Sequence, residues 1–547
     1  MNRKQDAMLR RRWVYVAQNL QVNENVPKVV ALLKRAKAAG YNGMVLADYK
    51  LNILGRVPDY YFKNAATVKQ AAAELGIAIY PTVCSCGYDN GLLAHDPNLA
   101  EGLPVKDAVF TVKGKTATLE SGNVLPGGAL DEARNGNFIG WDFNDAAALD
   151  TNVKKSGVGA LRFTATEGNL RVSKRLALPP FRQYHLSVWI KTEGFKSAGE
   201  IHCTVLTSGE KASLCHSNAG VKPTQDWTQH HFVFNTLDNP SIGIYLGCWG
   251  ASGGTLWLDD VRLEEVGLLN VVRRAGCPLT VRGNDDKGTL YTEGQDYEPI
   301  ADPRMGTVPW DGEFEVWHAP PSITIPSGSR IKDGQTLRVS YYHAITIYDG
   351  QVSASLVDPK VFALHQDQLQ RVQKLLTPAG FFLSHDELRT AGWSADAQAT
   401  GKTPGALLAE NARKCIALAK QTSPRAELVA WSDMFDPHHN AHDNYYLVRG
   451  TLAGSWEGLS KDTLIMNWNS GKPKESLDFF AKRGHAQILA GYYDGDPSAI
   501  KGWLATAKAL GGAKVEGVMY TTWANNYSQL EAFAKAAWGG AAGTSLG

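Results

Sequence analysis

The sequence predicts an α/β fold, a (β/α)8 TIM barrel that is interrupted after its third strand by an inserted β-sandwich of the jelly-roll type and by a further small β-rich segment. Three observations indicate this. Strand and helix patterns alternate over the first 85 residues, short and regularly spaced strand patterns fill the middle, and strand and helix patterns alternate again towards the end. Three strands before the β-rich block and five after it make the eight of one barrel. A doubly wound open sheet is the main alternative.

Residues 1–122 are expected to form the first part of the barrel. Apolar runs of strand length and apolar repeats of helical spacing follow one another there, which is typical of parallel sheets. In chain order the expected elements are strand 13–19, helix 26–39, strand 43–48, helix 66–75 and strand 77–84.

Residues 123–266 are expected to form the inserted sandwich, because short alternating strand patterns are separated there by Gly, Asn, Asp and Pro turns. The expected strands include 159–165, 184–191, 201–206, 228–235, 242–248 and 255–265. Residues 267–345 are rich in Gly and Pro and are expected to form the further small β-rich segment.

Residues 346–547 are expected to complete the barrel. Helix 359–376 is amphipathic, and helix 404–421 carries Pro near its first turn, as helix starts prefer. The other expected elements are strands 380–383, 427–431, 463–467, 486–491 and 517–521 and helices 445–452, 474–483, 497–510 and 528–538.

The overall composition narrows the range of partners and locations. The 56 basic and 54 acidic side chains are spread along the chain without a basic run, so we expect no nucleic-acid partner. No apolar stretch of about 18 residues occurs, so we expect no membrane span. Residues 1–12 lack the apolar core of a signal peptide, so the protein is expected to be cytoplasmic, or secreted or periplasmic with its signal removed. The 7 cysteines are expected to be mostly free and buried.

Side chains suited to sugar chemistry stand where the barrel strands are expected to end. Active sites of such barrels lie at the carboxyl ends of the strands, and flat aromatic faces suit sugar rings. Asp48 ends the second strand and either binds a sugar hydroxyl or caps the following turn. The later strand ends carry His385, Asp386 and Glu387, then Trp431 and Asp433, then Trp468, then Tyr492 and Asp494, and finally Trp523.

The adjacent carboxylates Asp386 and Glu387 are the candidate reaction centre. Retaining glycosidases usually place two carboxyl groups about 5–5.5 Å apart across the scissile bond. Neighbours on one strand point to opposite faces, so this pair does not simply flank a bond. It suits substrate-assisted catalysis, in which a 2-acetamido oxygen attacks the anomeric carbon while one carboxyl protonates the leaving oxygen and the other holds the acetamido N–H.

Residues 359–523 resemble the catalytic barrel of glycoside hydrolase family 20, the β-N-acetylhexosaminidases. The resemblance implies that Glu387 is the general acid and base, that Asp386 orients the acetamido group and that Tyr492 bonds its oxygen. It also implies a substrate-binding set of Trp431, Trp468, Trp523, Asp494, His385, Asp433 and Asp48. Ser384 and His385 replace the family's usual Gly-Gly, and Arg56 is the candidate for its sugar-gripping arginine. Residues 254–263 resemble the last strand of jelly-roll carbohydrate-binding modules.

Two other functions stay open. A conventional retaining glycosidase would use Glu387 as acid and base and Asp494 as nucleophile, and a non-catalytic carbohydrate-binding protein would use the barrel only as a scaffold. The expected partner in each case is an oligosaccharide or glycoconjugate, with no cofactor and no metal. The loop with His438, His439 and His442 is interpreted as solvated, as a substrate contact or as a metal site.

Overall fold

The computed structural model describes residues 9–284, 287–348 and 350–540. The chain divides into two compact units. The first, the barrel unit, takes its described residues from Met1–His95, Leu356–Leu388 and Gly401–Gly547, and the second, the β unit, from Asp96–Ser355 and Arg389–Thr400.

Eight parallel strands of the barrel unit close into a barrel in the order β1, β2, β3, β22, β24, β26, β27, β28. The ring closes because β28 pairs in parallel with β1. The strands are β1 (Arg11–Val16), β2 (Gly43–Leu46), β3 (Ala78–Cys86), β22 (Gly380–His385), β24 (Glu427–Trp431), β26 (Leu464–Asn467), β27 (Gln487–Tyr492) and β28 (Val515–Thr521).

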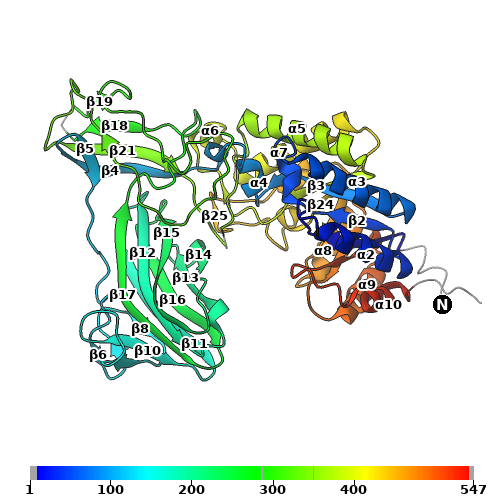
Figure 1. Cartoon of the computed structure of the whole chain (residues 1–547), viewed down its shortest axis with the longest axis horizontal. Helices are drawn as coiled ribbons and strands as arrows, with labels where there is room; N and C mark the ends of the chain where they lie inside the picture. Colours follow the sequence, from blue (N-terminus) through cyan, green and yellow to red (C-terminus); the bar gives the residue numbers. More distant parts are fainter. Residues whose placement is uncertain (1–8, 285–286, 349, 541–547) are drawn as a thin grey trace, which may run out of the picture. The chain divides into compact units, whose positions relative to one another are not determined.

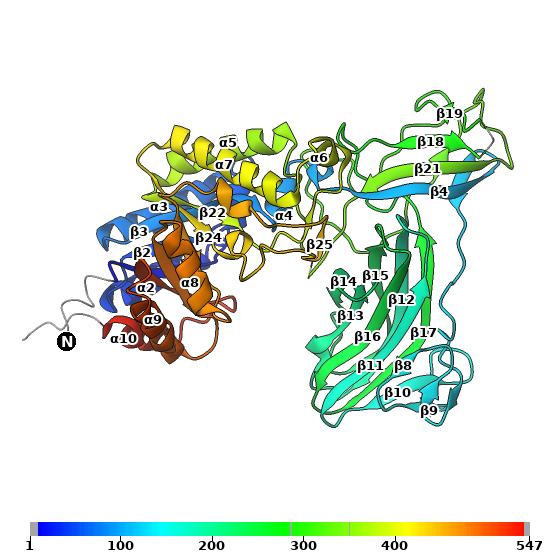
Figure 2. The ribbon, with the colours of Figure 1, turned by 180° about the vertical axis from the view of Figure 1, so that it is seen from behind.

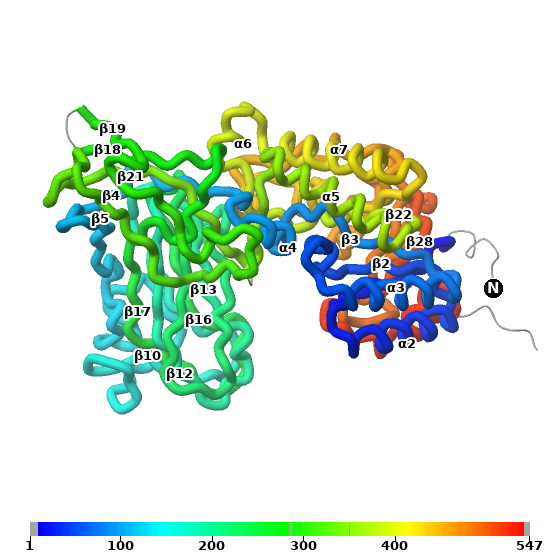
Figure 3. The backbone as a smooth tube through the Cα atoms, turned by 45° about the horizontal axis from the view of Figure 1, so that its top comes forward, coloured from blue at the N-terminus to red at the C-terminus, as the bar shows by residue number. Residues whose placement is uncertain are grey.

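Helices pack outside this barrel, and α5 and α7 lie side by side (Figures 2 and 3). Asp358 caps α5 by accepting from Lys360 N, and Thr403 caps α7 by accepting from Ala406 N, each just before a proline at the first helical position. The helices of this unit are α2 (Asn25–Ala38), α3 (Asp59–Glu74), α4 (Asn90–Leu93), α5 (Pro359–Leu376), α7 (Pro404–Thr422), α8 (Pro473–Lys482), α9 (Ile500–Ala509) and α10 (Leu530–Trp538).

The structure corrects the predicted fold class, which placed a helix after each strand of a (β/α)8 barrel. Between β24 and β26 the chain forms the 3-10 turns η4 (Asp433–Phe435) and η5 (Ser455–Gly458) and the two-residue strand β25 (Leu447–Val448). This segment contains no α-helix. The expected helix 445–452 is therefore wrong. Asn444, Tyr446 and Gly450 have φ values of 58°, 47° and 93°, which interrupt a right-handed helix. The observed fold is an eight-stranded closed parallel barrel together with antiparallel sheets.

Two five-stranded antiparallel sheets make up most of the β unit, in the orders β15-β12-β17-β10-β9 and β14-β13-β16-β11-β8 (Figure 1). Their strands are β8 (Phe143–Asn144), β9 (Ala148–Asp150), β10 (Ala160–Thr164), β11 (Gly168–Ala177), β12 (Gln183–Glu193), β13 (Ile201–Leu206), β14 (Ser213–Asn218), β15 (Gln225–Asn235), β16 (Ser241–Ala251) and β17 (Thr255–Val266). Buried and less buried residues alternate along β13, as expected for a sheet with one face towards a core.

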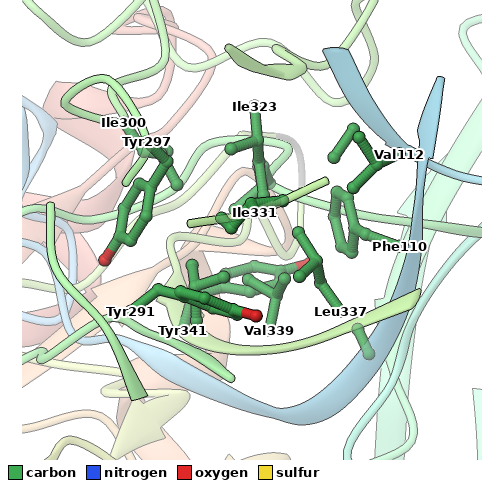
Figure 4. Packing of buried hydrophobic residues seen from close by; sticks show 14 of the residues in the cluster. Phe110, Val112, Tyr291, Tyr297, Ile300, Ile323, Ile331, Leu337, Val339 and Tyr341 are labelled. Atoms are coloured by element: carbon green, nitrogen blue, oxygen red, sulfur yellow. The ribbon is translucent and has the colours of Figure 1, made fainter. Parts of the chain in front are cut away.

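A six-stranded sheet, β19-β18-β21-β4-β5-β20, completes the β unit. Leu337 of β21 pairs with Phe110 of β4, and both contribute to a buried apolar cluster with Tyr341 (Figure 4). Strands β4 and β5 lie within residues 1–122, which were expected to form the first part of the barrel, but they belong to this sheet. The sheet contains β4 (Leu103–Lys113), β5 (Thr116–Leu119), β18 (Thr280–Gly283), β19 (Leu290–Tyr291), β20 (Ile323–Thr324) and β21 (Thr336–His343), and the unit also holds β6 (Ala133–Arg134), β7 (Asn137–Phe138), β23 (Thr390–Ala391) and α6 (Ala395–Ala399).

Two expectations drawn from composition can be compared with this structure. None of the helices in the described ranges is long and apolar enough to cross a membrane. The seven cysteines are buried and none of them forms a disulfide, as the sequence predicts.

Candidate active site

A cavity of about 790 Å³ opens at the carboxyl ends of the barrel strands. Its lining combines polar side chains with aromatic ones. The lining residues are Tyr15, Ala17, Gln18, Asn19, Ala47, Asp48, Tyr49, Asn52, Thr82, Ser85, Tyr88, Ser384, Asp386, Glu387, Trp431, Trp468, Tyr493 and Trp523.

Asp386 and Glu387 both line this cavity, although neighbours on a regular strand face opposite ways. The pairing of β22 with β3 shifts its register between Leu383 and His385, and β22 ends at His385. Glu387 then adopts a left-handed backbone with φ of 46°. The expectation that the two carboxylates point apart therefore fails, because both lie beyond the strand in a turn. Left-handed backbone is uncommon for a residue with a side chain and is often found at functional sites.

Neighbouring elements hold the backbone of this turn on both sides. Asp386 N donates to Cys86 O of β3 at 3.1 Å, and Glu387 N donates to Asp433 Oδ2 at 2.9 Å. Gly87 lies so close that a Cβ at this position would stand 2.0 Å from Asp386 O. The carboxylates are thus presented by a turn that is fixed from β3 and from the segment after β24.

Asp433 supports this site from within the protein, since it is fully buried and is not among the cavity-lining residues. Besides Glu387 N, its carboxylate accepts from Asn440 Nδ2 at 3.0 Å and from Trp468 Nε1 at 3.1 Å. Burial, together with the negative charge of Glu387, raises the pKa of Asp433 to about 6. Its contacts fix the turn that carries Asp386 and Glu387 and the ring of Trp468, and they leave Asp433 outside the cavity lining.

His385, also expected to contact substrate, is buried below the turn and is absent from the cavity lining. Its Nε2 lies 2.8 Å from Asn411 Oδ1 of α7, so this ring nitrogen carries a proton and donates it to the amide oxygen. The position of His385 as the last residue of β22, facing the helix layer, explains why it cannot reach the cavity.

Five aromatic rings form a continuous wall. Trp431, Trp468 and Trp523 line the cavity at the ends of three strands, where the sequence places them, and Tyr15 and Tyr493 fill the gaps between them. Ring centroids are 5.2 Å apart for Tyr15 and Trp523, 5.7 Å for Tyr493 and Trp523, and 6.1 Å for Trp468 and Tyr493. Such a wall offers flat apolar faces of the size of a sugar ring.

The turn after β27 presents a different tyrosine from the one that the sequence indicates. Tyr492, Tyr493 and Asp494 have φ values of 72°, 50° and 58°. Tyr493 lines the cavity, whereas Tyr492 stacks on Tyr520 with ring centroids 4.4 Å apart. Burial and the charges of Asp433, Asp386 and Glu387 raise the pKa of Tyr493, so its hydroxyl stays a proton donor.

Asp494 accepts hydrogen bonds from the neighbouring strand end and does not line the cavity. Its Oδ2 accepts from Trp523 N at 2.8 Å and from Ala524 N at 3.2 Å, and its Oδ1 accepts from Thr522 Oγ1 at 2.5 Å. Asp494 therefore positions the segment that carries Trp523.

Asp48 caps the turn after β2 and also lines the cavity. It caps η1 (Tyr49–Asn52) by accepting from Lys50 N, and it also accepts from Leu20 N and Tyr61 Oη while lining the cavity. Burial raises the pKa of Asp48. Three donors of the protein therefore already bind the Asp48 carboxylate in the absence of a ligand.

Several lining residues were missed from the sequence. Gln18, Asn19, Asn52 and Tyr88 follow the first three strands and Ser85 lies at the end of the third, so the strand-end rule that singled out the later residues would have found them too. Tyr88 has the most direct contact, because its hydroxyl donates to Glu387 Oε2 at 2.5 Å.

Positive charge is missing from the cavity lining among the described residues, which includes no Lys and no Arg. Arg56, the candidate sugar-gripping arginine, is not part of the lining, and its Nη2 donates to Ala94 O at 2.7 Å.

The ring of His439 packs on Trp468 with centroids 4.2 Å apart, while His438 and His442 are exposed. Nowhere in the described ranges do three or more His, Cys, Asp or Glu side chains gather in a way that could hold a metal ion.

No family model and no curated protein matches the chain. Among solved structures, a rhamnosidase from Novosphingobium sp. PP1Y is similar at 11% identity over 97% of this chain and 58% of its own, with a TM-score of 0.34. A chitobiase from Flavobacterium johnsoniae is similar at 16% identity over 36% of this chain and 31% of its own, with a TM-score of 0.24. A family 16 carbohydrate-binding module is similar at 18% identity over 26% of this chain and 99% of its own, with a TM-score of 0.20.

Glycoside hydrolases and carbohydrate-binding modules are thus among the solved structures that parts of this chain resemble. At identities of 18% or less and TM-scores of 0.34 or less, the activity has to be inferred from the residues of the chain itself.

Proposed function

We propose that the chain is a glycoside hydrolase of the β-N-acetylhexosaminidase type that uses substrate-assisted catalysis. The observation that carries this proposal is the placement of Asp386 and Glu387 side by side in one cavity whose wall contains three tryptophans. Neighbouring carboxylates in one turn approach a sugar from the same side. They suit a substrate that brings its own nucleophile better than an opposed pair of acid and nucleophile.

In the proposed reaction, Glu387 donates its proton to the glycosidic oxygen as the bond from that oxygen to the anomeric carbon breaks. The acetamido oxygen forms the new bond to the anomeric carbon and gives an oxazolinium ion. Asp386 stays ionised and accepts the acetamido N–H, which orients the attacking oxygen. Glu387 then takes a proton from the water that opens this ion, so the overall configuration is retained.

Tyr493 takes the role that the sequence gave to Tyr492. Its ring lines the cavity beside Trp468 and Trp523, and the raised pKa keeps its hydroxyl protonated, so that it can donate to the acetamido oxygen. The aromatic wall would enclose the acetamido methyl and exclude water from the reacting oxygen.

The charges of the cavity lining indicate whether the substrate sugar is itself charged. Within the described structure the cavity lining has three carboxylates, on Asp48, Asp386 and Glu387, and no side chain that is always positive. A sulfate or carboxylate on the sugar would meet like charge without a partner, which disfavours its binding. We therefore propose uncharged 2-acetamido sugars as substrates.

The test is a panel of nitrophenyl β-glycosides with the purified chain. Glycosides of GlcNAc and GalNAc should be cleaved, and those of glucose, galactose and glucuronic acid or of a sulfated GlcNAc should be cleaved at least about 100-fold more slowly in kcat/KM. A thiazoline that mimics the oxazolinium ion should inhibit competitively. Equal cleavage with and without the acetamido group would contradict substrate assistance, and no cleavage of any member would contradict the glycosidase proposal.

A further inference from the structure

The end of β3 and the loop that follows it contact the turn that carries Asp386 and Glu387. Cys86 O accepts from Asp386 N, Gly87 packs against Asp386 O, and Tyr88 Oη donates to Glu387 Oε2. The loop itself is anchored, because Gly87 N donates to Oδ2 of the buried Asp89 at 3.0 Å and Leu93 N donates to Asp89 O at 2.8 Å. The approach of Tyr88 to the carboxylate is therefore built into the fold.

We propose that Tyr88 is a positioning residue for the proton of Glu387: its hydroxyl holds Oε2, so that Oε1 carries the proton which is delivered to the leaving group and later recovered from water. This inference rests on the proposed function. It concerns a residue that the strand-end analysis of the sequence did not select.

The chemistry follows from the two oxygens of a carboxyl group. An oxygen that already accepts a hydrogen bond is the poorer place for the acid proton, because the neighbouring donor would then face another donor. A phenol bonded to Oε2 therefore favours the proton on Oε1. Glu387 N donates to Asp433 Oδ2, so the backbone of this residue is held as well as its carboxyl oxygen.

The proton balance is complete within the proposed reaction. Oε1 gives its proton to the glycosidic oxygen, which takes the electron pair of the breaking bond and leaves as a neutral alcohol. Oε1 then accepts one proton from the attacking water, and the hydroxide oxygen forms the new bond to the anomeric carbon. Tyr88 keeps its own proton throughout and donates to Oε2 in both states.

Replacement of Tyr88 by Phe removes the hydroxyl and keeps the ring. The side chain is 43% exposed, so the loss of one oxygen should leave the fold intact. The decisive measurement is kcat/KM for two substrates with the same acetamido sugar, one with another sugar as leaving group and one with 2,4-dinitrophenol. The sugar leaves only with a proton, whereas dinitrophenolate leaves with little help from an acid.

We expect Y88F to lower kcat/KM for the disaccharide about 10- to 100-fold, which is the size of a hydrogen bond to a charged group, and for the dinitrophenyl glycoside less than about 3-fold. The matched control is Y60F, which removes the hydroxyl of Tyr60 on α3, 42% exposed and outside the cavity lining. Its values should equal those of the wild type.

Equal losses on both substrates would overturn the inference, because Tyr88 would then act on sugar binding or folding. Unchanged values on both substrates in an active enzyme would also overturn it and would leave the proposed function standing. A wild-type chain that cleaves neither substrate would overturn the proposed function itself, so the two failures are distinguishable.

Discussion

The turns that follow β22 and β27 both contain acidic residues, and both pass through left-handed backbone. After β22, two neighbouring carboxylates, Asp386 and Glu387, line the cavity. After β27, only Tyr493 does so, while Tyr492 packs on Tyr520 and Asp494 bonds the backbone next to Trp523. Similar residues at equivalent strand ends thus line the cavity in one turn and mainly support the fold in the other, and the local backbone decides which.

The largest expected effect separates the two acidic turns. Glu387→Gln removes the transferable proton, and we expect kcat/KM for an acetamido disaccharide to fall about 1000-fold or more. Asp494→Asn keeps one oxygen as acceptor for Trp523 N and replaces the oxygen that faces Thr522 by an amide, and we expect a fall of at most about 10-fold. Initial rates with both variants measure this, and circular dichroism checks their folding.

A fall of similar size in both variants would reverse this comparison. It would favour the conventional mechanism in which Asp494 is the nucleophile, and trapping of a covalent glycosyl-enzyme on Asp494 would then be expected.

A smaller effect should distinguish the two tyrosines of the second turn. Tyr493→Phe removes the donor that we propose for the acetamido oxygen, and we expect kcat to fall about 10- to 100-fold. Tyr492→Phe should change kcat by less than about 3-fold, because its ring is 8% exposed and lies outside the cavity lining. Steady-state kinetics on a nitrophenyl acetamido glycoside decide between them, and a larger loss for Tyr492→Phe would restore the residue that the sequence indicated.

These tyrosines show how far the sequence could lead. Periodicity and caps predicted α5 and β24 with the bounds that the structure has, since strong local signals determine both elements. The strand ends that carry Glu387, Trp431, Trp468 and Trp523 followed from the same patterns. The pattern could not choose between Tyr492 and Tyr493, because three consecutive left-handed residues, of which Tyr492 is the first, redirect the chain where β27 ends.

The expected helix 445–452 failed for a related reason. Tyr445, Val448 and Leu452 are buried at helical spacing, yet left-handed residues lie between them. Apolar spacing reports which side chains are buried, and it does not exclude an irregular segment that buries the same residues. The positions of Asp433 and His385 at strand ends predicted substrate contacts for both. Only their burial shows that they lie under the turn and do not line the cavity.

The contact of Gly87 with Asp386 O, in the turn after β22, can be tested by substitution. Gly87→Ala would place a Cβ 2.0 Å from Asp386 O at a residue with φ of 121°. We expect a loss of about 2–4 kcal/mol in the free energy of unfolding, together with a loss of activity, because backbone must shift. Gly450→Ala is the matched control, with φ of 93° and nothing within 4 Å of the added Cβ, and it should cost about 1 kcal/mol.

Urea unfolding at neutral pH measures both glycine variants. If Gly87→Ala costs no more than Gly450→Ala, the contact with Asp386 O is not a constraint on the turn, and the position of the carboxylates would have to come from Asp433 and β22 alone.

The finest difference between the turns lies in their supporting carboxylates. Burial, then the charge of Glu387, raises the pKa of Asp433 to about 6. Burial acts in the same direction on Asp494, but hydrogen bonds from Thr522, Trp523 N and Ala524 N outweigh it and lower the pKa of Asp494. The folded chain therefore binds a proton at Asp433 more tightly than the unfolded chain does, and at Asp494 less tightly.

The two aspartates should consequently give pH dependences of opposite sign. With Asp433, the free energy of unfolding should fall by about 2–3 kcal/mol as pH rises from about 4 to about 6. The stability advantage of the wild type over Asp433→Asn should then shrink across that window. The advantage over Asp494→Asn should be fully present at neutral pH and should decline as pH drops below about 4. Urea unfolding of the three proteins across pH measures both slopes. Parallel slopes for the two variants would mean that the carboxylates have similar surroundings, and the contrast between a buried support for Glu387 and an exposed support for Trp523 would then fail.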